Sequence, residues 1–171
     1  MQNQPLVLAP WDAYPMPGLE IPNDFYWVLE RPTPLAGMRY PRGDPWRQLW
    51  DAGFRHVVNV AEEEAGYDPA PLGVLYVARM HSLDVDVARE HRRVREAVAT
   101  AKEKILEGDG VVVHCMGGWG RSGTVIGAIL RSLGFEAVEV LQHLNALHRA
   151  RGMDGWPEAE WQQKLVEAWP D

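Results

Sequence analysis

Short apolar runs and longer segments of helical period follow one another along this chain. The apolar runs at residues 25–29, 35–38, 56–60 and 74–78, and the run that begins at Val111, are typical of strands. Apolar side chains at helical spacing predict helices between Pro45 and Gly53 and over residues 87–107, 123–133, 137–149 and 157–169. Asp44 is the expected N-cap of the first of these helices, with Pro45 in its first position. We therefore place the folded domain at residues 25–171.

Residues 1–24 differ from the rest of the chain in composition. They carry prolines at positions 5, 10, 15, 17 and 22, with aromatic side chains scattered between them. Proline lacks a backbone N–H and fits poorly inside helices and sheets, so we predict a proline-rich, irregular arm. The pattern leaves open whether this arm is an ordered cover over the domain or a tail that binds a partner.

Composition and charge exclude several classes of protein. The 171 residues, 46% of them hydrophobic, are enough for one domain with a full core. The formal net charge of −7 argues against binding to nucleic acid or to an anionic membrane, because both are bound through clustered cations. The sequence shows neither a signal-peptide pattern nor a long uncharged apolar run, and its single cysteine excludes an internal disulfide. We therefore expect a soluble, cytoplasmic protein. We also expect it to be a monomer.

Candidate chemistry is concentrated in the stretch VVVHCMGGWGRSGT at residues 111–124, which predicts a strand, a glycine-rich loop and the start of a helix. Cys115 stands at the end of the strand, and Arg121 follows after five residues, three of them glycines. Glycines let successive backbone N–H groups turn inward, and such a loop at a helix N-terminus binds oxyanions such as phosphate. The same donors stabilise a thiolate at Cys115. The planar guanidinium of Arg121 binds two phosphate oxygens at once.

The pattern HC-x5-R-S, carried by His114, Cys115, Arg121 and Ser122, resembles the signature of the cysteine-dependent protein tyrosine and dual-specificity phosphatases. Three further stretches resemble other parts of that family in the same order: WVLERPTPLAGMRYP at residues 27–41, VVNVAEEE at 57–64 and PEAEWQQKLV at 157–166. The resemblance covers residues 21–169, and it is strongest to the small atypical dual-specificity group.

This resemblance implies a single α/β domain with a central, mostly parallel twisted sheet of about four to five strands flanked by helices. It implies a hydrolase of phosphomonoesters that accepts phosphotyrosine and phosphoserine or phosphothreonine of proteins in a shallow site, through a phosphocysteine on Cys115. Phosphate would bind Met116, Gly117, Gly118, Trp119, Gly120 and Arg121. Ser122 would donate a hydrogen bond to the departing sulfur, His114 would order the loop, and Gln162 would help to position the hydrolytic water. No cofactor and no metal ion are expected.

The family also needs a general acid, because an alkoxide or phenoxide leaves poorly at neutral pH. In the family that this chain resembles, an aspartate lies about thirty residues before the cysteine. Asp84 lies 115 − 84 = 31 residues before Cys115, and Asp86 lies 115 − 86 = 29 residues before it. Asp86 is placed to be the N-cap of the helix predicted at residues 87–107. We therefore predict Asp84 as the acid, which also activates water in the second step, with Asp86 as the alternative.

Other interpretations of the loop remain open. A chain that keeps the loop but lacks a working acid would be a phosphate-binding module without turnover. A small-molecule or lipid phosphate is another possible substrate, although Met116 and Trp119 stand where phosphoinositide phosphatases of this superfamily tend to carry lysines. Trp119 either forms a wall for an aryl group or packs under the last helix.

The glycines at 118, 120 and 123 also match the dinucleotide-binding pattern G-x-G-x-x-G. That pattern requires an acidic residue at the end of a second strand about 20 positions further on. Residues 135–148 have helical period instead, so a dinucleotide-binding enzyme is the weakest of these interpretations.

Overall fold

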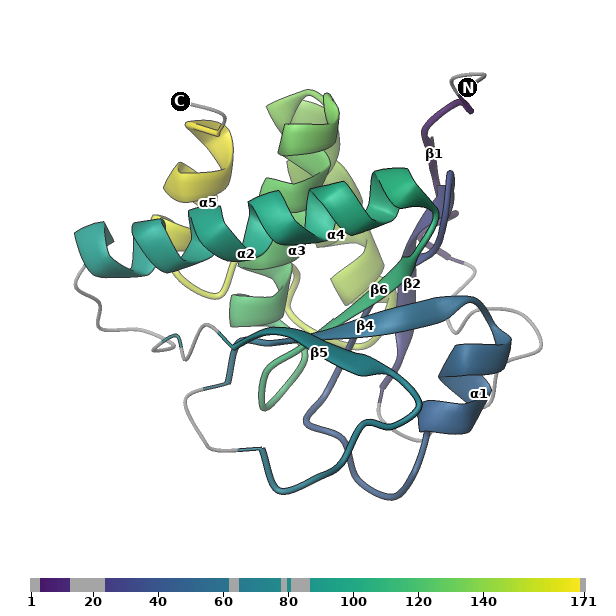
Figure 1. The fold of residues 1–171 in the computed structure, drawn as a ribbon. Coiled ribbons are helices and arrows are strands. Elements are labelled where there is room, and N and C mark those ends of the chain that lie inside the picture. Colours follow the sequence, from purple (N-terminus) through teal and green to yellow (C-terminus); the bar gives the residue numbers. More distant parts are fainter. Residues whose placement is uncertain (1–3, 13–23, 62–64, 78–79, 81–86, 170–171) are drawn as a thin grey trace.

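The computed structural model describes residues 4–12, 24–61, 65–77, 80 and 87–169, with side chains described from residue 91 onward in the last of these segments. Eleven elements lie in these residues, and Figure 1 labels them. They are β1 (Val7–Leu8), β2 (Tyr26–Arg31), β3 (Leu35–Met38), α1 (Trp46–Asp51), β4 (Phe54–Asn59), β5 (Gly73–Val77), α2 (Val87–Glu107), β6 (Gly110–His114), α3 (Gly120–Leu133), α4 (Ala137–Ala150) and α5 (Glu160–Glu167).

The sheet has six strands in the order β1-β2-β3-β6-β4-β5. The four neighbouring strands β3, β6, β4 and β5 are parallel. At one edge of the sheet, β2 pairs with β3 and β1 pairs with β2, both in antiparallel orientation. In the central strand β6 all five residues are buried, as its unbroken apolar run predicts. Its last residue, His114, pairs with Met38 of β3 and with Asn59 of β4. The carboxyl ends of three strands therefore meet where the glycine-rich loop begins.

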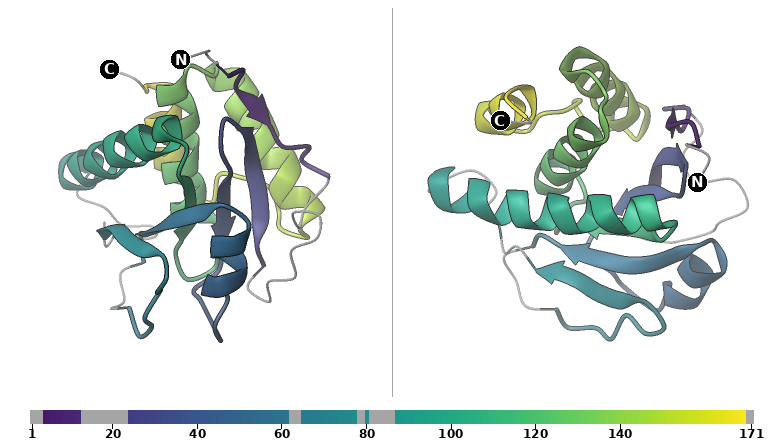
Figure 2. Two further views of the ribbon diagram at one scale, coloured as in Figure 1. Left: turned by 45° about the vertical axis from the view of Figure 1, so that its right-hand side comes forward. Right: turned by 45° about the horizontal axis from the view of Figure 1, so that its top comes forward.

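Helices cover both faces of this sheet (Figure 2). Val111 and Val113 of β6 lie in a core cluster with residues of α2, α3, α4 and α5. Val112, on the opposite face, lies in a second cluster with Trp46 and Leu49 of α1. Because successive side chains of a strand point to opposite faces, one buried strand joins the two apolar layers.

The α/β fold and the mostly parallel sheet agree with the sequence prediction. The strand β3 and the helix α2 have the predicted bounds. The sheet has one strand more than the four to five expected. The additional strand is β1, which comes from the proline-rich arm: Val7 and Leu8 pair with β2, and the N–H of Ala9 donates to the carbonyl of Val28 at 2.8 Å. The division between an arm and a domain at residue 24 stays a prediction.

Helix starts differ from the predictions more than strand positions do. The N-cap of α1 is Pro45 rather than Asp44, because the first helical bond runs from the N–H of Leu49 to the carbonyl of Pro45 at 3.1 Å. Helix α3 begins at Gly120, three residues before the predicted start, and α5 begins at Glu160, three residues after it. Gly134 ends α3 with a left-handed φ of 108°, as its position in the sequence predicts.

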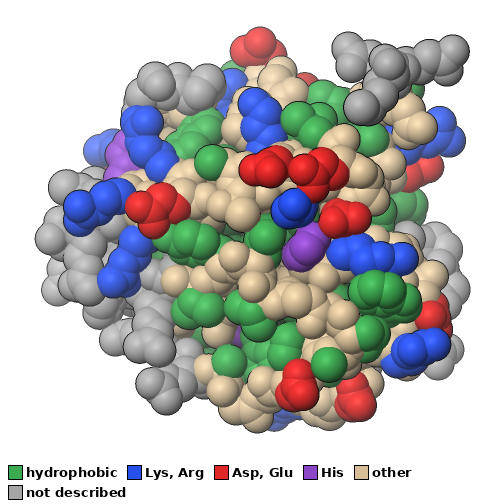
Figure 3. All heavy atoms as spheres, in the orientation of Figure 1, with side chains coloured by type: hydrophobic (Ala, Val, Ile, Leu, Met, Phe, Trp, Pro, Cys, Tyr) green, Lys and Arg blue, Asp and Glu red, His purple; other side chains and the backbone are tan. Residues whose placement is uncertain are grey.

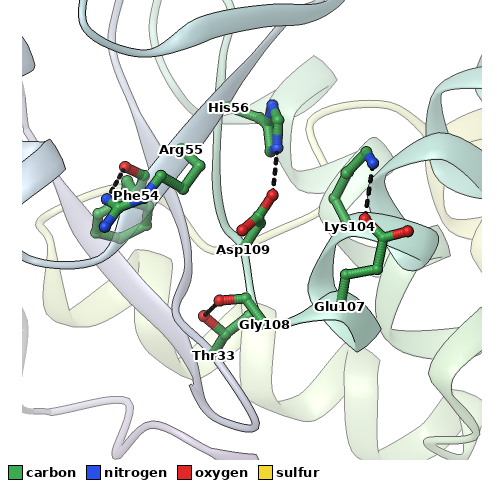
Figure 4. Close-up of polar contacts among 8 residues, drawn as sticks. All are labelled: Thr33, Phe54, Arg55, His56, Lys104, Glu107, Gly108 and Asp109. Atoms are coloured by element: carbon green, nitrogen blue, oxygen red, sulfur yellow. Dashed lines mark hydrogen bonds and ion pairs between the residues drawn. The ribbon is translucent and has the colours of Figure 1, made fainter.

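Polar contacts join the chain near the amino-terminal ends of β3, β4 and β6, at the end of the sheet away from the glycine-rich loop (Figure 4). Nε2 of His56 lies 2.8 Å from Oδ2 of Asp109, and the hydroxyl of Thr33 donates to the carbonyl of Gly108 at 3.1 Å. The glycine-rich loop lies at the opposite end of the same parallel strands.

The outer surface of α2 is charged. In Figure 3 the Lys and Arg side chains gather over the first half of this helix, whereas acidic side chains are grouped over its second half. This face of the molecule therefore presents both signs of charge side by side. Within the described part of the chain, no helix is long and apolar enough to cross a membrane.

Candidate active site

Cys115 follows β6 directly and is 2% exposed. The loop that it opens is attached to the extensions of both neighbouring strands: the N–H of Tyr40 donates to the carbonyl of Met116, and the N–H of Val60 donates to the carbonyl of His114, each at 2.9 Å. Parallel pairing of β6 with β3 and β4 thus fixes where the cysteine emerges. Met116, the next residue, is 41% exposed, so the loop reaches the surface at this point.

Several backbone N–H groups of this loop have no hydrogen-bond acceptor among the described residues. Among the residues that the structure describes, none accepts a hydrogen bond from the N–H of Met116, Gly117, Gly118 or Trp119. The next residue, Gly120, begins α3, a helix of 14 residues. Free N–H groups at the amino end of a helix bind anions, because they add to the positive end of the helix dipole. The loop is therefore built to hold an oxyanion beside Cys115.

Gly118 gives the loop its shape. Its φ is +67°, and a Cβ at this position would lie 2.5 Å from the carbonyl carbon of Met38. A side chain would therefore meet both a strained backbone conformation and the main chain of β3. Gly117, its neighbour, has no positive φ, and a Cβ added to it would have no heavy atom within 4 Å. The two glycines are thus required to different degrees.

Arg121 and Ser122 occupy the first turn of α3 behind the loop. Arg121 is 9% exposed, and one of its guanidinium nitrogens, Nη1, donates to the carbonyl of Met80 at 3.2 Å. The hydroxyl of Ser122 is buried and has no hydrogen-bond partner among the described residues. A buried hydroxyl normally has a partner, so this one is available for a group that binds at the loop.

His114 is wholly buried between two partners. Its Nδ1 lies 3.2 Å from the carbonyl oxygen of Cys115, and its Nε2 contacts the hydroxyl of Tyr67. Burial lowers the pKa of His114 to about 4, so the imidazole is neutral at pH 7. The carbonyl only accepts, so Nδ1 carries the proton, and Nε2 accepts from the hydroxyl of Tyr67. These contacts hold the imidazole at the start of the loop, and the loop-ordering role expected for His114 stays a prediction. The sequence alone did not identify Tyr67 as part of the site, because no local pattern links it to His114, 47 positions away.

Gln162 lies behind the loop and is wholly buried. Its Oε1 accepts from the N–H of Glu158 at 3.0 Å and from the N–H of Ala159 at 3.2 Å. Its Nε2 is buried without a partner in the described part of the chain. The side-chain oxygen is therefore engaged in holding the chain before α5, and its expected role with water stays a prediction. Asp84 and Asp86 lie outside the described residues, so the choice of acid also stays a prediction.

Two tryptophans fasten the segment between α4 and α5 to the loop. Nε1 of Trp119 donates to the carbonyl of Gly155 at 2.5 Å, and Nε1 of Trp156 lies 3.4 Å from the carbonyl oxygen of Gly120. Trp119 is half-buried, so of its two proposed roles packing beneath the chain before the last helix is the one that the contacts support. Trp156 lies against Gly123, where a Cβ would be 2.2 Å from Nε1 of the indole.

Arg151, at the end of α4, contacts the loop from the other side. Its Nη1 donates to the carbonyl of Gly118 at 3.3 Å and lies 2.8 Å from Nδ1 of His148. Its guanidinium carbon lies 4.1 Å from the centre of the Tyr26 ring. Burial, reinforced by the charge of Arg151, lowers the pKa of His148 to about 3. Sequence reasoning missed this cluster, because a single arginine near a helix end is an ordinary surface pattern.

No group of three or more His, Cys, Asp or Glu residues that could hold a metal ion is found in the described segments. The groups that these segments bring to the loop include a cysteine, an arginine and backbone N–H donors.

Comparisons with known proteins found chains of similar sequence and fold. The family model described as "Swiss Army Knife protein, DSP-PTPase phosphatase domain" matches residues 22–166. The crystal structure of DUSP15 is similar with a TM-score of 0.62 and 17% identity, covering 78% of this chain and 80% of that one. Tk-PTP in the active form is 28% identical with a TM-score of 0.57, covering 78% and 88%. PTPMT1 in complex with PI(5)P is 18% identical with a TM-score of 0.56, covering 78% and 87%. From its loop, its sheet and the span of the family match, this chain belongs to the DSP-PTPase family of phosphatase domains.

Proposed function

We propose that this protein removes phosphate from phosphotyrosine and from phosphoserine or phosphothreonine of proteins through a phosphocysteine on Cys115. One observation carries the proposal: Cys115 and Arg121 flank a loop whose N–H groups have no acceptor among the described residues. A phosphoryl group on this loop would receive backbone donors on its equatorial oxygens and the fork of Arg121 beside them.

The reaction has two steps in this proposal. The Cys115 thiolate attacks phosphorus, the S–P bond forms, and the P–O bond to the leaving group breaks as that oxygen takes a proton from an acid. Water then attacks phosphorus and passes a proton to the carboxylate that the acid left behind, the S–P bond breaks, and the thiolate is restored with a hydrogen bond from Ser122. Asp84 remains our predicted acid, and Asp86 its alternative.

A protein substrate is favoured over a lipid headgroup by the side chains of the loop. Met116, the loop's exposed side chain, and Trp119, which is bound to Gly155, are both uncharged. A phosphoinositide carries further phosphates, which are best held by cations that these two positions lack. The complex of PTPMT1 with PI(5)P concerns a relative of 18% identity, a likeness that extends to the fold alone.

The first prediction concerns the two residues at the ends of the loop. Cys115→Ser should reduce hydrolysis of p-nitrophenyl phosphate to background, because the hydroxyl is a far weaker nucleophile than a thiolate. Arg121→Lys should lower kcat/KM by about 100-fold or more, since a point charge cannot replace two parallel hydrogen bonds. Both are measured without metal ions between about pH 5 and 7.5.

Arg47→Lys is the matched control for the second change, because Arg47 lies on α1 in an exposed ion pair with Asp51. Near-normal turnover by Arg121→Lys would contradict the bidentate clamp. A wild-type protein that binds vanadate but hydrolyses neither nitrophenyl phosphate nor phosphopeptides would be a phosphate-binding module, and phosphoinositides preferred over phosphopeptides would overturn the substrate assignment.

A further inference from the structure

A carboxylate lies against the phosphate loop from a part of the chain that no mechanism above uses. Glu158 stands two residues before α5, and its Oε2 would be 2.0 Å from a Cβ built on Gly120. The missing side chain of Gly120 therefore makes the space that this carboxylate occupies. Gly120 is the first residue of α3 and directly precedes Arg121, so Glu158 sits at the helix end that faces a bound anion.

The backbone around Glu158 is held by contacts that do not involve its side chain. Its N–H donates to the buried oxygen of Gln162 at 3.0 Å. Two residues earlier, Trp156 is 4% exposed, and its ring lies against Gly123. Its backbone N–H donates to Oδ1 of Asn145 at 3.2 Å. The carboxylate is thus carried on a rigid segment.

The carboxylate itself has no hydrogen-bond or ion-pair partner in the part of the chain that the structure describes. No described residue donates a hydrogen bond to it or forms an ion pair with it, whereas the carboxylate of Glu160, two residues on, lies 2.9 Å from Nζ of Lys164. Glu158 is also an exposed residue, so water reaches it. An ionised carboxylate only accepts hydrogen bonds, and a water molecule is the partner at hand. The helix dipole of α3 offsets the repulsion that a nearby phosphoryl group exerts on this charge.

We propose that Glu158 is a catalytic residue of the second step, the base that takes a proton from the water which hydrolyses the phosphocysteine. The inference rests on the proposed function and revises one part of it, the assignment of this proton transfer to Asp84 or its alternative Asp86. The oxygen of water forms a bond to phosphorus, the S–P bond breaks, the proton passes to the carboxylate of Glu158, and phosphate leaves with Cys115 again a thiolate. Gln162 is then a positioning residue, which fixes the backbone of Glu158.

The test separates the two steps by stopped-flow kinetics with p-nitrophenyl phosphate. Nitrophenol leaves readily, so Glu158→Ala should form phosphocysteine at the wild-type rate and release a burst of nitrophenol equal to the enzyme present. The steady-state rate after the burst should fall about 100-fold. Protein quenched at alkaline pH during that phase should carry one phosphoryl group by intact-mass measurement. Formate, a small carboxylate, should restore part of the steady-state rate in this variant.

Glu160→Ala is the control, because Glu160 is the neighbouring glutamate and its surface ion pair contributes little to stability. A thermal shift with vanadate shows that each variant still folds and binds at the loop. Steady-state rates that match between Glu158→Ala and Glu160→Ala would overturn the inference. So would a slower burst without accumulated phosphoenzyme, which would assign Glu158 to the leaving group instead. A wild-type protein no more active than Cys115→Ser would instead refute the proposed function itself.

Discussion

Gly117 and Gly118 are neighbours of the same residue type, yet their surroundings differ. The left-handed φ of Gly118 and the main chain of Met38 beside it leave no room for a side chain, whereas Gly117 borders open space. In an anion-binding loop, the orientation of each peptide plane sets the direction in which its N–H points. At this scale the shape of the loop rests on one glycine more than on the other.

We therefore expect Gly118→Ala to destabilise the protein by about 2 kcal/mol or more, from the left-handed backbone and the contact with Met38. Vanadate affinity should fall by at least about tenfold, because the loop must shift. Gly117→Ala should change both quantities little. Urea unfolding and vanadate titration of the two variants provide the measurement, and equal effects of the two substitutions would show that the loop tolerates a side chain at either glycine.

At the scale of elements, the loop is held by a helix that is remote in the sequence. The end of α4 brings Arg151 to the carbonyl of Gly118, 33 residues away along the chain. That bond turns the carbonyl toward the arginine, so the next N–H is free to point toward a bound anion. The same guanidinium lies on the ring of Tyr26 and thus joins α4 to β2.

Arg151→Ala should lower the free energy of unfolding by about 2 kcal/mol, because it removes charge-assisted hydrogen bonds and a cation–π contact. It should also weaken vanadate binding, while Arg151→Lys should recover part of the stability and little of the binding. Arg47→Ala, in an exposed ion pair on α1, serves as the control with an expected change below about 0.5 kcal/mol. Unchanged vanadate affinity in Arg151→Ala would mean that the loop keeps its shape without this contact.

At the scale of the whole molecule, two imidazoles are buried as neutral groups. Burial lowers the pKa of His114 to about 4 and that of His148 to about 3, while both titrate near 6.5 in an unfolded chain. As the pH falls below 6.5, the unfolded chain takes up protons that the folded state excludes. The stability contributed by these residues is therefore complete above pH 6.5 and is lost as the pH falls toward 4.

The free energy of unfolding should decrease between about pH 6.5 and 5 by up to about 1.4 kcal/mol per pH unit for each histidine. Urea unfolding at several pH values in this range measures the slope. His148→Asn should have a shallower slope than the wild type, since one of the histidines whose pKa is lowered by burial is gone. An identical slope in both proteins would show that His148 takes no part in the pH dependence.

Much of the fold was accessible from the sequence, because local patterns record it. The bounds of β3 and α2 follow from apolar periodicity, and the left-handed end of α3 follows from a glycine placed after its last apolar residue. The cysteine, the glycines and the arginine of the loop are likewise contiguous, so the anion-binding stretch was visible as a string of residues. Chemistry that lies within a short run of neighbouring residues needs no tertiary information to be recognised.

Other parts of the site depend on residues that only folding brings together. Tyr67 reaches His114, Arg151 reaches Gly118, and Glu158 reaches Gly120, across separations at which no periodicity links one residue to the other. The strand β1 escaped prediction for the same reason: two residues of a proline-rich arm form a strand only because β2 offers an open edge. The sequence by itself determined the family, the α/β fold and the position of the cysteine-containing glycine-rich loop, since each follows from a local pattern of residues. The tertiary structure decided which distant side chains hold that loop and which carboxylate lies beside it, because those contacts depend on the packing of whole elements.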